Sequence, residues 1–429
     1  MGQMKIVMLS TTADCGGAAI ACKRLWRALK NTGQAEVKLI VRSATSTEES
    51  VYVLDRTCWG KWKNLFHFVW ERLVIWCCNC FSRRHLFAVS IANAGTDVSE
   101  LPDIQQADII HLHWINQGFL SLKGIRKLLD LGKPVVWTLH DMWPCTSICH
   151  YARECDHFTE GCRNCFYLRY PSSHDLSAGV WKKKDFLNDS GIHFVAVSSW
   201  LKVQVKRSAL THQVETIVIP NVLDLQLFYP REGTTLKQEL NIPVTKKIIV
   251  FGATKVDAPL KGFDLLKDAL RQLCREQNWK KEWMLLIFGD VHEKAEQVFG
   301  DLYCDYLYLG PIADINRLAE LYTIADITAV PSHYETFGQV IIESMACGTP
   351  VVSFDSSGQT DIISHREDGY LAAYKDTKDF AEGIKWLLSE ADYRKVAEKA
   401  RHKVKDHYSE EVVAHQYLNF YQRLLKCGN

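Results

Sequence analysis

The stretch that decides the fold is ITAVPSHYETFGQVIIESMACGTPVVSF, residues 327–354. Its two ends, 327–330 and 351–354, are short continuous apolar runs, which are typical of buried parallel strands. The apolar positions that keep helical spacing between them are Val340, Ile341, Met345 and Ala346. Gly348 supplies a C-cap and Pro350 a stop signal. The stretch therefore predicts a strand, a helix and a second strand.

The same alternation recurs on both sides of this stretch. Further strands are predicted at 6–9, 37–41, 109–113, 135–139, 194–197, 217–219, 248–251, 284–288 and 306–309. Alternating strands and helices indicate the α/β class, with open parallel sheets covered by helices on both faces. We expect two Rossmann-like, doubly wound domains facing a central cleft, over 1–221 and 222–405, and a C-terminal helix at 406–429 that packs back toward the first domain. Ligands of such sheets bind at strand carboxyl ends, so the cleft is the expected active site.

Composition excludes several classes of protein. Hydrophobic residues make up 47% and charged residues 24%, which is ordinary for a soluble globular chain. The 51 basic and 50 acidic side chains leave a net charge of +1, so no cationic excess is available for a nucleic-acid partner. The N-terminus lacks a charged region followed by a long apolar stretch, so we expect no secretory signal and a cytoplasmic location.

Residues 331–343 carry the chemistry of the strand–helix unit. The helix predicted to begin at Phe337 or Gly338 offers a positive dipole end, which suits a phosphate, and the glycine lets a ligand approach the backbone. Glu335 lies in the loop before this helix. Glu343 lies two turns along it, where a carboxylate accepts hydrogen bonds from a diol such as ribose. The alternative is two solvated glutamates, one at the helix start and one on its polar face.

Glu335 and Glu343, with seven residues between them in this context, resemble the signature of the retaining GT-B glycosyltransferases, family 4. Neighbouring motifs agree with this resemblance. They are the runs 219–230, 309–326, 357–363 and 368–371. The resemblance covers nearly the whole chain and is strongest over residues 215–372.

The resemblance implies transfer of a sugar, with retention, from a nucleotide diphosphate sugar to a hydroxyl of a saccharide or lipid-linked saccharide. The usual setting of such relatives is bacterial surface polysaccharide biosynthesis, at the inner face of the membrane. No protein nucleophile is assigned, and no cofactor is required for catalysis. Neither the oligomeric state nor the donor base is assigned by the sequence.

The resemblance also implies individual roles. Glu335 contacts hydroxyls of the donor sugar, and Glu343 holds the ribose of the nucleotide. Phe337 and Gly338 present backbone to the sugar and the diphosphate. Lys261 matches the lysine that binds the diphosphate, where an ammonium stabilises charge on the leaving phosphate. The alternative for Lys261 is a surface lysine at a helix start.

One position departs from the family pattern. Many relatives have arginine directly after the strand glycine, which is Gly252 here, whereas this chain has Ala253. Lys255 is near enough along the chain to reach the same phosphates, although an ammonium lacks the bidentate geometry of a guanidinium. This departure favours a competing hypothesis, a non-catalytic GT-B scaffold that serves as a metal-stapled interaction module. The intact Glu335 and Lys261 favour the enzyme.

Glycines and histidines occupy strand ends in the first half of the chain. Gly16 and Gly17 precede a helix predicted at 18–29 and allow a tight turn with close ligand approach. The resemblance places this loop toward the diphosphate and acceptor, and a purely structural turn is the alternative. His140 follows the strand at 135–139, and the resemblance places it near the donor sugar.

Three further residues belong to the acceptor side of the predicted site. Asp141 follows His140, and His113 with Trp114 occupies the equivalent place one strand earlier. His111 lies within that strand, and we expect it to be a core histidine with satisfied hydrogen bonds.

A cysteine-rich insert at about 145–170 is the unusual feature of the first domain. Cys162 and Cys165 have the knuckle spacing of tetrahedral zinc, and Cys149 and Cys155 form a looser second half. We predict that a structural zinc staples this loop. Free thiols are the alternative, and disulfides are disfavoured in the cytosol.

The stretch 59–78 keeps apolar residues at helical spacing, flanked by Lys61, Lys63, Arg72, Arg83 and Arg84. Two interpretations are open. It is either an interfacial helix that seats the protein on a membrane by peripheral contact, or a buried helix of the first domain.

Overall fold

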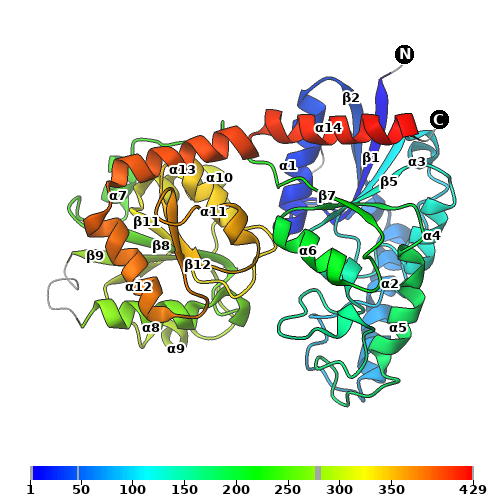
Figure 1. Ribbon diagram of the computed structural model, residues 1–429, viewed down its shortest axis with the longest axis horizontal. Helices are drawn as coiled ribbons and strands as arrows, with labels where there is room; N and C mark the ends of the chain where they lie inside the picture. Colours follow the sequence, from blue (N-terminus) through cyan, green and yellow to red (C-terminus); the bar gives the residue numbers. More distant parts are fainter. Residues whose placement is uncertain (1–2, 46–47, 276–281, 428–429) are drawn as a thin grey trace. The chain divides into compact units, whose positions relative to one another are not determined.

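The computed structural model describes residues 3–45, 48–275 and 282–427. The chain divides into two compact units, residues 1–222 with 413–429, and residues 223–412 (Figure 1). Each unit is a parallel sheet with helices on its faces, so the prediction of two Rossmann-like α/β domains is confirmed. The division beside Val222 falls next to the predicted boundary, and the end of the C-terminal helix is part of the first unit.

The first unit contains a seven-stranded parallel sheet in the order β3-β2-β1-β4-β5-β6-β7. The strands are β1 (Met4–Thr12), β2 (Ala35–Ser43), β3 (Val51–Val53), β4 (Ile109–Leu112), β5 (Val135–Leu139), β6 (His193–Ala196) and β7 (Glu215–Val218). Every residue of β4 and β5 is buried, as continuous apolar runs predict for central parallel strands. His113 is the first residue after β4, so the predicted strand is one residue too long.

The helices of the first unit cover both faces of this sheet. They are α1 (Gly17–Asn31), α2 (Cys58–Cys78), α3 (Pro102–Gln106), α4 (Leu122–Leu129), α5 (Leu176–Lys184), α6 (Ser199–Arg207) and the end of α14 (Glu410–Cys427). Side chains of α1 and α14, among them Trp26 and Tyr417, share one apolar core with β1, β2 and β4. The C-terminal segment is therefore an integral layer of this unit.

The second unit contains a six-stranded parallel sheet in the order β10-β9-β8-β11-β12-β13. The strands are β8 (Lys247–Lys255), β9 (Trp283–Asp290), β10 (Tyr306–Tyr308), β11 (Ile327–Val330), β12 (Val351–Phe354) and β13 (Gly369–Ala372). Counted from β8, this is the 3-2-1-4-5-6 order of a Rossmann sheet. The sequence analysis does not predict β3 and β13, which are short strands at sheet edges.

The helices of the second unit are α7 (Thr234–Glu239), α8 (Phe263–Leu273), α9 (Ala295–Phe299), α10 (Ile315–Ile324), α11 (Gln339–Ala346), α12 (Thr377–Lys385) and α13 (Tyr393–Tyr408). One apolar core joins α8, α9 and α12 to alternate residues of the strands, such as Ile249 and Phe251. α11 begins at Gln339 with Gly338 as its N-cap, one residue after the predicted start, and its C-cap is Cys347, one residue before the predicted Gly348, which has φ of 81°. Among the described residues, every helix falls short of the length or apolar character that a membrane span requires.

Candidate functional site

Each sheet reverses its strand order at one point, and the predicted site residues follow the strands that meet there. The reversal lies between β8 and β11 in the second unit and between β1 and β4 in the first. In doubly wound sheets, ligands bind outside the strand carboxyl ends at this point. Lys255 ends β8, and the loop that carries Glu335 follows β11. The topology thus brings together segments that are about 80 residues apart in sequence.

Two close backbone contacts hold the Lys261 segment against the loop after β11. The His333 N–H donates to the Leu260 carbonyl at 3.0 Å. Gly262 has φ of 66°, and a Cβ at this position would lie 2.0 Å from the Pro331 carbonyl oxygen. Only glycine accepts both the backbone angle and the close approach. This packing fixes the position of Lys261 relative to Glu335.

Lys261 and Glu335 form an ion pair, with 2.6 Å between Nζ and Oε1. The side chains are 34% and 18% exposed, so both charges are accessible from solvent. The Glu335 N–H donates to Ser357 Oγ at 3.0 Å, and its carbonyl accepts from the Gly358 N–H at 2.7 Å. The loop after β12 therefore holds the backbone of Glu335, while its carboxylate stays available. An ammonium and a carboxylate side by side suit a ligand that has both phosphate and hydroxyl groups.

Gly338 is the N-cap of α11 and has φ of 118°. A Cβ here would lie 2.7 Å from Ile341 Cδ1, so the torsion disfavours a side chain and Ile341 would have to shift to admit one. The Phe337 ring is buried and packs edge-on against Tyr408, with 5.6 Å between ring centroids. The ring of Phe337 therefore faces the protein interior, and contact of its backbone with a sugar or diphosphate stays a prediction.

Glu343 lies on α11 and is buried. Tyr322 OH donates to its Oε2 at 3.3 Å. The interpretation of Glu343 as a solvated residue on a polar helix face is therefore wrong. Binding of a ribose by Glu343 stays a prediction. The Tyr322 hydroxyl orients the carboxylate that would do so.

Ala253 and Lys255 lie near the end of β8 with opposite environments. Ala253 is buried in the apolar core of the unit, whereas Lys255 is exposed and its Nζ lies 2.6 Å from His292 Nε2. Lys255 is thus the exposed cation at this strand end, consistent with the place that the sequence analysis gave it.

Three histidines meet at the carboxyl ends of β4 and β5 in the first unit. His113 Nδ1 lies 2.9 Å from His140 Nε2, and the rings of His111 and His113 are 4.2 Å apart. His111 is fully buried, with Thr138 Oγ1 and Tyr421 OH each 2.8 Å from its ring nitrogens, so its prediction as a satisfied core histidine is confirmed. Burial lowers the pKa of His140 to about 4 and that of His111 to about 3. The cluster is therefore uncharged at neutral pH.

His113 is itself buried, and within the described residues its Nε2 has no hydrogen-bond partner. Burial and the two neighbouring histidines hold its pKa well below the usual range. A small hollow beside it is lined by Ala21, Leu25, His113, Thr138, His140, Pro220, Asn221, Val222 and Tyr417. Of the residues predicted on the acceptor side, His113 thus reaches a ligand only through this hollow or through His140.

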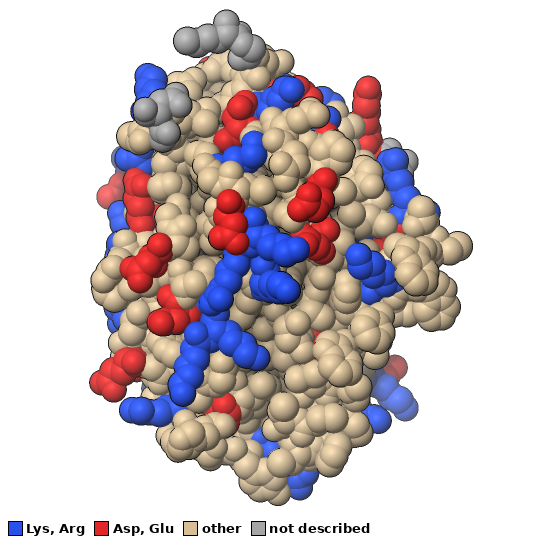
Figure 2. Space-filling view, turned by 90° about the vertical axis from the view of Figure 1, so that its right-hand side faces the viewer, with Lys and Arg blue, Asp and Glu red and all other residues tan. Residues whose placement is uncertain are grey.

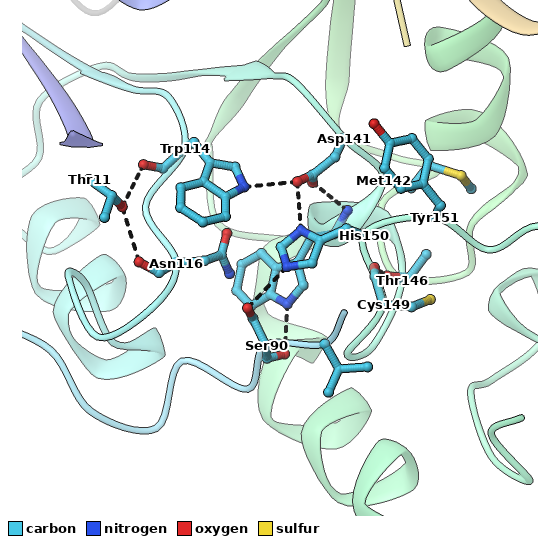
Figure 3. Close-up of polar contacts among 12 residues, drawn as sticks. Thr11, Ser90, Trp114, Asn116, Asp141, Met142, Thr146, Cys149, His150 and Tyr151 are labelled. Atoms are coloured by element: carbon cyan, nitrogen blue, oxygen red, sulfur yellow. Dashed lines mark hydrogen bonds and ion pairs between the residues drawn. The ribbon is translucent and has the colours of Figure 1, made fainter. Parts of the chain in front are cut away.

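Asp141 is the centre of a polar network that Figure 3 shows. Its Oδ2 accepts from Trp114 Nε1 at 2.9 Å and lies 2.6 Å from His150 Nδ1, while its Oδ1 accepts from the Trp143 N–H at 2.9 Å. Burial raises the pKa of Asp141, but the charge and hydrogen bond of His150 outweigh it and leave the pKa below its usual value. Asp141 is therefore a buried carboxylate, and Trp114 is fixed by it.

Ser90 extends this network, since its Oγ lies 3.0 Å from His150 Nε2. The sequence analysis missed Ser90 and His150 as members of the site. His150 stands beside Cys149 and was passed over as part of the cysteine motif. Ser90 is 60 residues away in sequence and carries no local signal.

Gly16 and Gly17 join β1 to α1, as the sequence predicts. Gly16 is the N-cap of α1 with φ of 89°, and a Cβ at either glycine would meet nothing within 4 Å. The backbone here is therefore open to a ligand, and its predicted role at the diphosphate stays a prediction.

Comparison with known proteins places this geometry in a family. Residues 15–227 match the family described as Glycosyltransferase Family 4, and residues 233–404 match the family described as glycosyl transferases group 1. The two matches meet beside the division between the units. The chain belongs to the GT-B glycosyltransferases of group 1 and family 4.

Individual relatives are distant. The chain is 29% identical over 211 residues to N-acetyl-alpha-D-glucosaminyl L-malate synthase of Bacillus anthracis, covering 48% of this chain and 53% of that protein. It is 31% identical over 183 residues to D-inositol 3-phosphate glycosyltransferase of Geodermatophilus obscurus, covering 41% and 40%. The chain thus spans about half or less of the length of these curated relatives.

Solved structures of low sequence identity share the fold over almost the whole chain. Sucrose-phosphate synthase of Thermosynechococcus elongatus superposes with a TM-score of 0.67 at 19% identity, covering 99% of this chain and 100% of that one. HepE of Anabaena, solved with UDP and glucose, gives a TM-score of 0.64 at 17% identity, covering 98% and 100%. These likenesses show that the chain has the GT-B fold.

The four cysteines of the insert lie near one another. Burial raises the pKa of the Cys149, Cys162 and Cys165 thiols to about 12, and nearby thiols, Cys155 among them, add to each shift. Across the described ranges, however, no three His, Cys, Asp or Glu side chains are arranged to hold a metal ion. Four cysteine thiols are a suitable set of ligands for zinc, and a bound zinc stays a prediction.

Lys184 organises the start of this insert and was missed by the sequence analysis. Its buried ammonium donates to the carbonyls of Trp143, Thr146 and Ser147, the last two at 2.9 and 3.2 Å. Its Nζ also lies 3.5 Å from the centroid of the Trp143 ring. Burial lowers the pKa of Lys184 to about 7, and the amino group, held by three carbonyls, fixes the loop after Asp141.

The stretch predicted as a helix at 59–78 forms α2, but the buried-helix interpretation is wrong. Its large apolar side chains, including Trp59 and Trp62, are exposed, while Glu71 and Arg72 are buried. The sequence could not reveal this, because Glu71 finds its partners 20 residues further along the chain.

Proposed function

We propose that this protein transfers a sugar, with retention at the anomeric carbon, from a nucleoside diphosphate sugar to a hydroxyl of a saccharide or lipid-linked saccharide. Surface polysaccharide biosynthesis in bacteria is the proposed setting. The observation that carries the proposal is the accessible Lys261–Glu335 pair beside the glycine-capped start of α11. The structures of HepE with UDP and glucose and with UDP-glucose support a nucleoside diphosphate donor for this fold.

In the proposed reaction, the bond between the anomeric carbon and the diphosphate oxygen breaks. A bond from the acceptor oxygen forms on the same face, and the acceptor proton passes to the departing phosphate. Lys261 leaves Glu335 to stabilise the charge that grows on that phosphate, and the dipole of α11 adds to it. Glu335, freed from Lys261, accepts hydrogen bonds from the donor sugar.

Residues of the first unit are proposed to serve both reactants, with His140 at a hydroxyl of the donor sugar and Trp114 at the acceptor. His140 is an uncharged imidazole beside the hollow, so it can donate or accept a hydrogen bond from a hydroxyl without adding charge. Asp141 fixes Trp114, which is proposed to pack on the acceptor. Gly16 and Gly17 are proposed to contact the diphosphate through backbone N–H groups.

A calorimetric panel of nucleoside diphosphate sugars tests the donor half of the proposal. We expect one member to bind wild type and to lose affinity in Lys261→Ala, while Lys267→Ala, whose partner is the surface residue Asp301, binds normally. Transfer of radiolabelled sugar to candidate acceptors, followed by NMR of the new anomeric linkage, tests retention. A panel with no binder would instead favour the non-catalytic scaffold.

A structural zinc at Cys149, Cys155, Cys162 and Cys165 is part of the proposal. The support is the closeness of four thiols in one loop, where Cys149 and Cys165 lie in a small apolar core with Ile148 and Tyr167. Elemental analysis of protein purified without chelator should find one zinc per chain, and Cys162→Ser with Cys165→Ser should remove it. Protein that folds normally with no zinc would contradict this assignment.

A further inference from the structure

The polarity of α2 is inverted relative to an ordinary surface helix. Its exposed apolar side chains, called here the α2 face, are Trp59, Trp62, Leu65, Phe66, Val69, Trp70 and Leu73. Trp59 is 80% and Trp62 69% exposed. At 3.6 residues per turn these positions fall within an arc of about 140°, which makes one continuous stripe. The polar side chains Asn64, Glu71 and Arg72 are buried on the other side.

Buried polar contacts lock the helix in this orientation. Glu71 Oε1 accepts from the N–H groups of Ile91 and Ala92, both at 2.8 Å, and its Oε2 lies 2.9 Å from Arg72. Arg72 also donates to the Val89 carbonyl at 2.9 Å. Rotating the helix about its axis to cover the tryptophans would separate Glu71 and Arg72 from these partners. Separating a buried charge from its partners is strongly unfavourable. These buried contacts therefore keep the α2 face exposed to solvent.

A second set of buried polar contacts lies about two turns earlier, at Asn64. Asn64 Oδ1 accepts from Thr96 Oγ1 at 2.6 Å, and its amide donates to Asp55. Gly118 has φ of 79°, and a Cβ there would lie 2.6 Å from the Phe68 backbone nitrogen. The backbone of α2 is thus in close contact with the loop after β4 along its polar side.

The exposed charges on the segment that carries the α2 face have one sign. Over residues 58–87, all of which the structure describes, the single acid is the buried Glu71. The exposed charged side chains there are Lys61, Lys63, Arg83 and Arg84. Lys61 and Lys63 fall on opposite edges of the apolar stripe, where long basic side chains extend toward anionic groups.

We propose that the α2 face docks this protein on an anionic phospholipid surface, with the helix lying in the plane of the interface. Tryptophan, phenylalanine and leucine on one face with lysine and arginine at its edges is the composition that binds such an interface. A second copy of the chain fits this face poorly. A twofold axis would place the four cations against each other, and no exposed acid within the face is present to pair with them.

The molecule has another basic surface that a test must separate from α2. Figure 2 shows Lys and Arg side chains gathered in a run on one side of the protein. Helices α4 and α5 contribute exposed cations near one another, since Arg126 donates to the Lys183 carbonyl at 3.4 Å. These cations have no comparable aromatic stripe in their helices.

Vesicle sedimentation of the full chain tests the proposal without donor or acceptor, so its outcome is independent of the proposed transfer. Wild type should bind vesicles of phosphatidylglycerol with phosphatidylcholine at low salt and not pure phosphatidylcholine. Trp59→Ser with Trp62→Ser and Phe66→Ser should weaken binding at least about tenfold, because three exposed aromatic anchors are lost. Lys61→Glu with Lys63→Glu should weaken it by about tenfold or more at low salt. Brominated lipid should quench tryptophan fluorescence of wild type.

Matched controls make each result decisive. Tyr303→Ser removes an exposed aromatic residue of the second unit and should leave binding unchanged. Lys182→Glu with Lys183→Glu changes the charge of α5 and should retain quenching by brominated lipid. The proposal is overturned if wild type does not bind, if the aromatic variant binds as wild type, or if only the α5 variant loses binding. Loss of a wild-type dimer in the aromatic variant would assign the face to a second copy instead.

Discussion

Two groups of residues at strand carboxyl ends show how burial decides what a side chain can do. In the second unit, Lys261 and Glu335 form an accessible ion pair. In the first, His111, His113 and Asp141 are buried, with pKa values shifted away from their usual ranges. An accessible pair can exchange its partner for a ligand at small cost, whereas a buried network loses stability when any member changes. The Lys261–Glu335 pair is therefore suited to binding a ligand, and the buried network of the first unit is suited to maintaining the local structure.

The largest effect that separates the two groups is expected from Lys261→Ala and Glu335→Ala. Each should lower the rate of the proposed transfer by about a hundredfold to a thousandfold, because each removes a charge aimed at the reacting groups. The free energy of unfolding of each variant should lie within about 1 kcal/mol of the wild-type value, since the ion pair is accessible to solvent. Steady-state kinetics and urea unfolding measure the two quantities. Transfer that survives either substitution would remove the assigned role.

Asp141→Asn should show the reverse pattern in stability. The buried carboxylate accepts three hydrogen bonds, from Trp114 Nε1, the Trp143 N–H and His150 Nδ1, and an amide cannot accept all of them, so we expect the free energy of unfolding to fall by about 3 kcal/mol. Glu335→Gln is the matched carboxylate-to-amide control and should cost less than about 1 kcal/mol. Equal losses for the two variants, measured by urea denaturation, would contradict the contrast between the groups.

Acid should weaken the first unit through its histidines. His111 has a pKa of about 3 in the fold and about 6.5 when unfolded, so the unfolded state binds more protons between these values. The contribution of His111 to the free energy of unfolding is fully present above pH 6.5 and decreases as the pH falls. At pH 5 it is smaller by about 2 kcal/mol. His111→Gln should flatten the pH dependence of stability, while His402→Gln on the surface should not. A steeper or unchanged profile in His111→Gln would exclude this cause.

The smallest effects are expected at two glycines. Gly338→Ala faces both φ of 118° and a 2.7 Å contact, and should cost about 2 kcal/mol of stability together with affinity for the donor. Gly16→Ala faces φ of 89° but open space, and should cost about 1 kcal/mol. Thermal unfolding ranks the two variants. A larger loss at Gly16 would indicate contacts that its open surroundings do not provide.

The sequence by itself determined the alternation of strands and helices, the two sheets and the start of α11. These depend on neighbouring residues: apolar runs, helical spacing, and Gly and Pro signals. It also indicated Lys261, Glu335 and Gly338, although their proximity over 74 residues became visible only in the fold. β3 and β13 escaped prediction because three or four residues at a sheet edge have too weak a pattern.

Only the tertiary structure decided which charges are buried and which apolar residues are not. Glu71 and Lys184 read as surface residues in the sequence, yet backbone groups at positions 91–92 and 143–147 enclose and satisfy them. Conversely, the apolar stripe of α2 reads as core, and the contacts of its polar side turn it outward. The spacing of apolar residues in the sequence indicates that a helix has an apolar face and a polar face. Which face the protein covers depends on partners distant in sequence, since a buried polar group is stable only where its hydrogen bonds are met.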